Sequence, residues 1–314
     1  MPHPAKYRDA FLFTRSLALS LADHPNRRWL LFLGWLAFSI AISWTAFTTL
    51  LRYSFGNDDA SHILLIPFIC AWLMFIERGR IFRSLSSDVT VCLVLLVPGV
   101  AIVLWSIRTQ PPSPSLCAFG LVLIWIAGFA LAFGREALKA ARFPLMFLFL
   151  FIPLPEALLN RVVYFLQKGS TEISALLFGL TPLPVLREGF VFHLPRFSIE
   201  VARECSGIRS SIALLVLAIL VGHFFLRTWW KQVVFVLAGL VVMIVKNGIR
   251  IVTLTVLASY VDPGFLYGNL HREGGVVFFM IGLLLMVPVF WVLQSKEPAE
   301  NLQATKIPAP VIES

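Results

Sequence analysis

The amino-acid sequence predicts an all-α polytopic membrane protein of about eight transmembrane helices, with a small β-hairpin on the extracytoplasmic side of the bilayer. Hydrophobic residues make up 58% of the 314 and charged residues only 14%, whereas a soluble domain carries about 25% charged residues. The mean hydropathy is +0.84. The apolar residues also gather in blocks, several of them close to the roughly 20 residues that a helix needs to cross hydrocarbon.

Eight apolar blocks qualify as spans, and the second and fifth of them are short. They cover residues 29–50, 62–76, 90–107, 115–133, 143–154, 205–226, 231–252 and 273–294. The fifth, FPLMFLFLFIPLP, is punctuated by proline and fits either a full crossing or half of a re-entrant element. The first block is longer than the roughly 7–15 apolar residues of a signal peptide, so we expect it to remain as a helix.

The basic residues predict the orientation. With the N-terminus inside, the expected cytoplasmic segments hold 15 of the 26 Lys and Arg residues, which is the positive-inside pattern. We therefore expect a basic cytoplasmic segment over 1–28, one membrane domain over 29–294 and a polar cytoplasmic tail over 295–314. The net charge of +9 matches anionic lipid headgroups, so the expected partners are membrane lipids and not nucleic acid.

The segment 155–204 is the largest one predicted outside the membrane. Its first half has apolar residues at helical spacing and predicts an interfacial helix or helix pair. Its second half changes to a period of two, in Phe190–Leu194 and again in Phe197–Glu204, with HLPR suited to a turn. This pattern predicts a β-hairpin whose second strand leads directly into Cys205.

Cys205 is the candidate nucleophile. It lies in RECSGIRSS, between the predicted strand and a long apolar helix. A helix N-terminus offers unpaired N–H groups and a positive dipole end, and both favour a thiolate. Arg209 adds a charge one turn further on, while Ser206 and Gly207 allow close approach of a reacting carbonyl. The alternatives are a structural thiol or a disulfide with Cys117.

The other three cysteines are Cys70, Cys92 and Cys117, and each lies inside an apolar block. A thiol in such a position behaves as a small hydrophobic side chain. We therefore expect a structural role for all three.

The motif VKNGIR contains charges inside an apolar block, where they are costly and often functional. Arg250 lies about 30 Å along the helix that begins at Lys231, at the expected outer boundary. Asn247 and Arg250 are three residues apart and share a face. The alternative for Arg250 is a snorkelling side chain that binds lipid phosphate, and Lys246 is expected to snorkel or to pair.

His271, in YGNLHREGG, lies just before the last span and on the same expected outer face. A thiolate, a guanidinium and an imidazole form a complete set for acyl transfer. No second His or carboxylate stands at ligand spacing from His271, so we expect no metal and no cofactor.

The three segments ECSGIRSS, NGIRI and the His before a Gly-rich final helix resemble the motifs of the exosortase/archaeosortase family. SHILLIP and FPLMFLFLFIPLP agree with it more weakly, although family members often carry Gly where this chain has Ile63. The resemblance covers about residues 60–290. It implies that Cys205 is the nucleophile, Arg250 stabilises the intermediate and His271 is the acid and base, with Arg272 as a neighbouring alternative.

Other matching motif positions imply supporting or substrate-binding roles. These are Glu204, Ser206, Gly207, Arg209, Asn247 and His62. His271 indicates the bacterial side of the family, since archaeal relatives tend to have Arg there.

The resemblance also implies a function, a location and partners. The chain would be a cysteine peptidase or transpeptidase of the bacterial inner membrane, with its active site on the extracytoplasmic face. Its substrates would be exported proteins with a C-terminal sorting signal of the PEP-CTERM type, made of a short motif, a transmembrane helix and a basic tail. A lipid or glycan would be the acceptor.

Two other functions fit the composition. A transporter would use Arg250, Lys246 and Asn247 as an anion site, but the sequence has no internal repeat of the kind that many transporters show. A scaffold for exopolysaccharide export would have no peptidase activity. Either would tolerate replacement of Cys205 by alanine, and a transpeptidase would not.

Overall fold

A computed structural model of the chain describes residues 25–57, 60, 62–109, 111–202, 208–266 and 275–295. The chain divides into two compact units, residues 1–155 and 156–314. Helices dominate both units, and one small antiparallel sheet belongs to the second.

The predicted membrane character is confirmed, but the count of eight spans is not. Among the described residues, four helices are long and apolar enough to cross a bilayer: α6 (Val89–Arg108), α7 (Pro114–Ala140), α11 (Trp229–Tyr260) and α13 (Gly275–Ser295). The number rises to six if two interrupted helix pairs, 26–56 and 142–178, each count as one span. The expected spans at 62–76 and 205–226 correspond to shorter apolar helices, 63–76 and 210–225.

The first expected span is interrupted. Residues 29–50 fall in two helices, α2 (Pro25–Ile42) and α3 (Trp44–Gly56), which meet at Ser43 with a bend of 83°. Apolar composition predicted a helix here correctly, but composition carries no signal for the direction change.

The N-terminal unit is built around α7, which packs against α6, α2 and α3. The other helices in its described residues are η2 (Ile63–Leu65), α4 (Ile66–Ile76), α5 (Arg78–Ile81), α8 (Arg142–Phe147) and η3 (Leu148–Phe151). Small residues let α6 and α7 approach closely, since a Cβ on Gly120 would lie 2.8 Å from the carbonyl oxygen of Gly99. Arg28 is buried and donates to the carbonyl oxygens of Ser86 (2.7 Å) and Ala132 (2.8 Å).

Gly134 marks a break inside α7. Its φ of +84° and ψ of −177° are non-helical, in a region that is essentially restricted to glycine. A Cβ at this position would also lie 2.0 Å from the Ser86 hydroxyl oxygen. Both the backbone conformation and the space therefore require glycine.

Replacing Gly134 by alanine should destabilise the N-terminal unit by about 1–3 kcal/mol, the usual range for a strained backbone position. The melting temperature of the purified protein in detergent measures the effect. Gly34→Ala in α2 is the matched control, because a Cβ there would meet nothing within 4 Å. Equal melting temperatures for the two variants would contradict the role given to Gly134.

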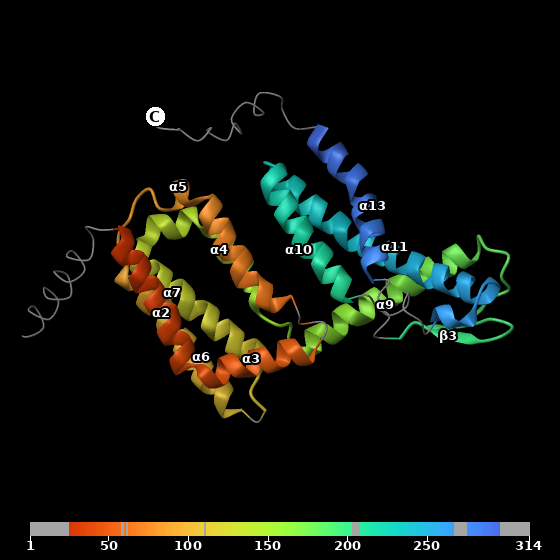
Figure 1. Cartoon of the computed structure of the whole chain (residues 1–314), viewed down its shortest axis with the longest axis horizontal. Coiled ribbons are helices and arrows are strands. Elements are labelled where there is room, and N and C mark those ends of the chain that lie inside the picture. The colour runs from red at the N-terminus through yellow and green to blue at the C-terminus, as the bar shows by residue number, and fades with distance from the viewer. Residues whose placement is uncertain are drawn as a thin grey trace, which may run out of the picture. The chain divides into compact units, whose positions relative to one another are not determined.

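The C-terminal unit is organised by α11, the longest described helix, which contacts α9 (Glu156–Phe178), α10 (Ile208–Phe225), α13 and the short η5 (Pro263–Leu266). Figure 1 shows α10 and α13 alongside one half of α11, and α9 alongside the other. Leu214, Phe235, Met243 and Met286 belong to the buried apolar cluster that joins α10, α11 and α13.

The predicted β-hairpin is confirmed, and a third strand joins it. The sheet has the order β1 (Leu186–Glu188), β2 (Val191–His193), β3 (Ser198–Glu200), with both neighbouring pairs antiparallel. The expected second strand, 197–204, is shorter in the structure, because β3 ends at Glu200. Strand β1 is exposed along its whole length, so it has no buried face that would require alternating apolar residues.

One face of the sheet packs on the helices. Phe192 and Val201 form a buried cluster with Phe178 of α9 and Val252 of α11. On the exposed side, Arg187 of β1 makes two hydrogen bonds to the Glu172 carboxylate of α9, at 2.9 and 2.7 Å. These bonds raise the pKa of the Arg187 guanidinium. The sheet is thus fixed to α9 and α11 together.

Candidate active site

Several predicted site residues lie outside the described part of the chain. They are Cys205, Glu204, Ser206, Gly207, His271 and Arg272, and their roles stay predictions. Arg209 is the second residue of α10, and only its backbone is described. His62 belongs to the N-terminal unit, where it precedes η2, and its supporting role also stays a prediction.

Asn247 and Arg250 lie on α11, within a band of polar side chains. We call the polar layer the set Ser170 of α9, Ser210 of α10, and Lys246 and Asn247 of α11. Lys246 and Asn247 are each 1% exposed. The Asn247 side-chain amide donates to the Ser170 hydroxyl at 3.0 Å, and the Lys246 ammonium donates to the Ser210 hydroxyl at 2.5 Å.

The hydrogen bond from Asn247 is enclosed by two glycine contacts. A Cβ on Gly169 of α9 would lie 2.9 Å from Ile244 of α11, and one on Gly248 of α11 would lie 2.5 Å from Ile173 of α9. On each helix, therefore, a glycine packs against an isoleucine of the other helix. This reciprocal contact brings the two backbones close enough for an amide and a hydroxyl to meet.

Lys246 contacts two further helices. Its ammonium reaches α10 through Ser210, while its Cδ would lie 3.3 Å from a Cβ placed on Gly282 of α13. The alternative of snorkelling is wrong, since the side chain is buried, and the described partner of Lys246 is a hydroxyl and not an acidic side chain. The aliphatic stem fills the space beside Gly282 and the charged head is held by a hydroxyl.

Arg250 follows Lys246 by one helical turn and is half-buried. The predicted end of its helix, at 252, is wrong, because α11 continues to Tyr260. Ten more residues add about 15 Å of helix beyond Arg250. Arg250 therefore lies within the helix, between the polar layer and Val252 of the cluster beneath the sheet.

The family model of the transmembrane exosortases matches residues 44–288. The chain belongs to the transmembrane exosortase family. No curated protein and no solved structure matches it. Exosortases are generally cysteine transpeptidases, so membership supports a transpeptidase-type role for a membrane protein.

Three cysteines of this exosortase have the structural role expected for them. Cys70, Cys92 and Cys117 are buried free thiols. The Cys117 sulfur lies 3.2 Å from the Ser106 hydroxyl oxygen, and the Cys70 thiol donates to the carbonyl oxygen of Pro144 at 3.3 Å. Cys205 lies outside the described residues, so the alternative of a disulfide between Cys205 and Cys117 stays a prediction.

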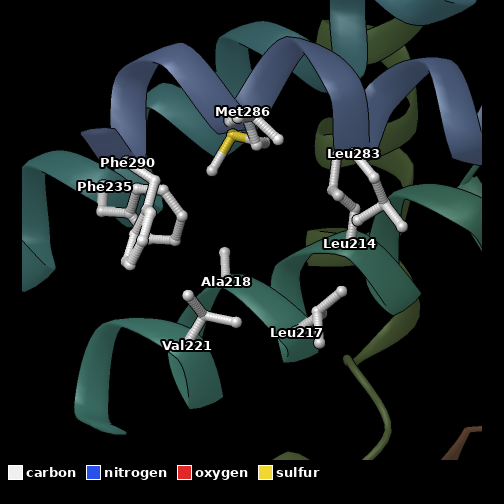
Figure 2. A pocket seen from close by; sticks show the side chains of 9 residues that line it. Leu214, Leu217, Ala218, Val221, Phe235, Leu283, Met286 and Phe290 are labelled. Atoms are coloured by element: carbon white, nitrogen blue, oxygen red, sulfur yellow. The ribbon is translucent and has the colours of Figure 1, made fainter. Parts of the chain in front are cut away.

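A cavity of about 220 Å³ opens in the C-terminal unit of the exosortase, between α10, α11 and α13. Figure 2 shows Met286 and Phe290 of α13 across from Ala218 and Val221 of α10, with Phe235 beside Phe290. All nine lining side chains are apolar. The cavity therefore offers no nucleophile, acid or base.

Sequence reasoning identified Asn247 and Arg250 but missed the buried serines of α9 and α10. Ser170 and Ser174 are fully buried and lie one turn apart on α9, and Ser211 of α10 is nearly so. In the described part of the chain, the Ser174 and Ser211 hydroxyl oxygens have no hydrogen-bond partner. The usable signal was the spacing of Ser170 and Ser174, which puts two hydroxyls on one face of an otherwise amphipathic helix.

These two serines of α9 permit a matched test of the polar layer. Ser170→Ala removes the acceptor of the Asn247 amide and should destabilise the protein by about 1 kcal/mol, typical of an interhelical hydrogen bond in a membrane protein. Ser174→Ala removes a hydroxyl without a described partner and should leave stability unchanged or raise it. Denaturant titration in detergent measures both, and equal losses would show that the Asn247 bond contributes nothing.

Proposed function

We propose that the chain is a membrane-embedded cysteine peptidase or transpeptidase that cleaves C-terminal sorting signals of exported proteins through a thioester. Cys205 is the nucleophile, Arg250 stabilises the intermediate and His271 transfers the proton. The observation that carries the proposal is how the chain is held on both sides of Cys205.

Residues before and after Cys205 are each attached to α11, and the two points of attachment lie on either side of Arg250 along that helix. Before Cys205, Val201 is buried in the cluster that includes Val252, and its N–H donates to the Phe190 carbonyl oxygen at 2.9 Å. After Cys205, Ser210 accepts a hydrogen bond from Lys246. Lys246 and Val252 are six residues apart, or about 9 Å along a helix, and Arg250 lies between them. Along the axis of α11, Lys246 and Val252 each lie within about 6 Å of Arg250, and this spacing supports the proposal that Cys205 reacts close to Arg250.

The reaction has two acyl-transfer stages. The Cys205 thiolate attacks the scissile carbonyl carbon, and the Arg250 guanidinium stabilises the resulting oxyanion. The C–N bond then breaks while His271 donates a proton to the leaving amine, which leaves a thioester on Cys205. An acceptor amine or hydroxyl attacks the thioester and gives its proton to His271. An amide or ester forms, and the thiolate is released. If water replaces the acceptor, the same steps constitute proteolysis.

The substrate and location follow from the same proposal. An exported protein with a C-terminal motif, a transmembrane helix and a basic tail keeps its tail in the cytoplasm of a bacterium. Its motif then emerges at the extracytoplasmic surface of the inner membrane, where Cys205 is expected. The acceptor is a lipid or a glycan.

Co-expression with a tail-bearing substrate tests the nucleophile. The wild type should shorten the substrate on a gel, and Cys205→Ser should leave it uncut, because serine lacks the low pKa that makes a thiol reactive. The mass of the new C-terminus then distinguishes transfer from hydrolysis. Cys117→Ser, at a buried thiol, is the matched control and should cut normally. Equal cutting by wild type and Cys205→Ser would remove the peptidase proposal and favour a transporter or an export scaffold.

Arg250→Lys tests the oxyanion role separately from charge. Lysine keeps the positive charge but loses the planar fork of N–H donors, so kcat should fall by roughly 10²–10³-fold, the usual loss for one oxyanion donor. Arg161→Lys, at an exposed position of α9 in the same unit, should leave kcat unchanged. Rates are compared at equal amounts of membrane-inserted protein. A full rate for Arg250→Lys would mean that Arg250 contributes only charge.

A further inference from the structure

The edge of β3 that faces away from β2 has backbone N–H and C=O groups that form no hydrogen bond within the sheet. The Leu194 N–H donates to the Phe197 carbonyl oxygen, and the Val201 N–H donates to the Phe190 carbonyl oxygen, both at 2.9 Å. In the β2–β3 register, Phe192 stands opposite Ile199. Because hydrogen-bonded pairs alternate in an antiparallel ladder, Phe197, Ile199 and Val201 direct their backbone groups toward β2.

Ser198 and Glu200 therefore direct their N–H and C=O groups away from β2. Both residues are exposed, and no further described strand pairs with β3, which is the last in the order β1-β2-β3. A strand edge of this kind is a ready template for an additional strand.

We propose that β3 binds the substrate's sorting motif as an added strand, parallel to β3; this rests on the proposed function, which supplies the substrate class. Glu200 precedes Cys205 by only five residues, so a motif paired with β3 lies next to the segment that carries the nucleophile. The opposite edge, β1, lacks this continuity, since Glu188 precedes Cys205 by 17 residues.

The direction of the added strand follows from chain order. In this protein β3 comes first and the apolar helix α10 follows it, and in the substrate the motif comes first and the transmembrane helix follows it. If both helices enter the bilayer from the surface where Cys205 is expected, both chains run toward the membrane and the two strands are parallel. An antiparallel strand would carry the scissile end away from Cys205.

Parallel pairing fixes the hydrogen bonds. The substrate residue opposite Ile199 donates its N–H to the Ser198 carbonyl oxygen and accepts from the Glu200 N–H. The Ser198 N–H and the Glu200 carbonyl bond to the substrate residues two before and two after it. Backbone bonds supply the affinity, and side chains alternate between the two faces of the sheet. Only every second residue of the motif can then share the exposed face with Ser198 and Glu200.

Disulfide trapping tests this arrangement in the full-length protein in membranes. The enzyme carries Glu200→Cys together with Cys205→Ala. The reporter is an exported protein that carries a sorting motif, a transmembrane helix and a basic tail from the same genome. Single cysteines are introduced one at a time along the reporter's motif. Cross-links should be strongest at the reporter position opposite Glu200, weaker two positions away on either side, and absent at the positions between, because disulfides need Cα atoms within about 7 Å. The matched control is Glu188→Cys in β1, an exposed glutamate at the other edge, which should give none of this pattern.

Cross-links at every position, at none, or equally from Glu188→Cys would overturn the proposal. Cleavage of the same reporter by the protein with Cys205 intact is measured in parallel. If cleavage occurs without the alternating pattern, strand addition fails and the peptidase function stands. If the pattern appears without cleavage, the binding edge stands and the peptidase function fails.

Discussion

The C-terminal unit depends on the need of two buried polar side chains for hydrogen-bond partners. Lys246 and Asn247 lie inside an apolar bundle, where an unpaired amide or ammonium is strongly unfavourable. Each finds a serine on a different helix, Ser210 on α10 and Ser170 on α9. Apolar contacts between helices tolerate sliding because any face of similar shape will serve, whereas these two bonds fix the register of α9 and α10 on α11.

The packing of the sheet depends on this fixed register of α9 and α11. Its buried face rests on Phe178 of α9 and Val252 of α11, so it can pack in one way only when those two helices are held together. The Arg187–Glu172 ion pair adds a further link from β1 to α9. An exposed ion pair adds little stability by itself, and its main effect here is to orient the strands. The position of β3 on these helices is thus a consequence of the bonds made deeper in the bundle.

The sequence was sufficient for features that depend on local periodicity. Alternation in Phe190–Leu194 and Phe197–Glu204 predicted the β2–β3 hairpin, and long apolar blocks predicted helices α6, α7, α11 and α13. It was insufficient where the partner is distant in the chain. Strand β1 is defined by its pairing with β2, and the bend at Ser43 has no compositional signal. For Lys246, helical spacing shows which residues share its face, but not that Ser210 of α10 lies opposite.

Charge explains why reaction chemistry would concentrate at this point of α11. Arg250 follows Lys246 by four residues on α11, and like charges at this spacing repel each other, more strongly inside a protein than in water. A fold that retains such a pair loses stability there unless an anion offsets the repulsion. A thiolate or a tetrahedral oxyanion would do so, but so would a transported anion. The proposed peptidase and the alternative transporter would each place an anion beside these two cations, and only the peptidase requires a nucleophile, which is why Cys205 decides between the two functions.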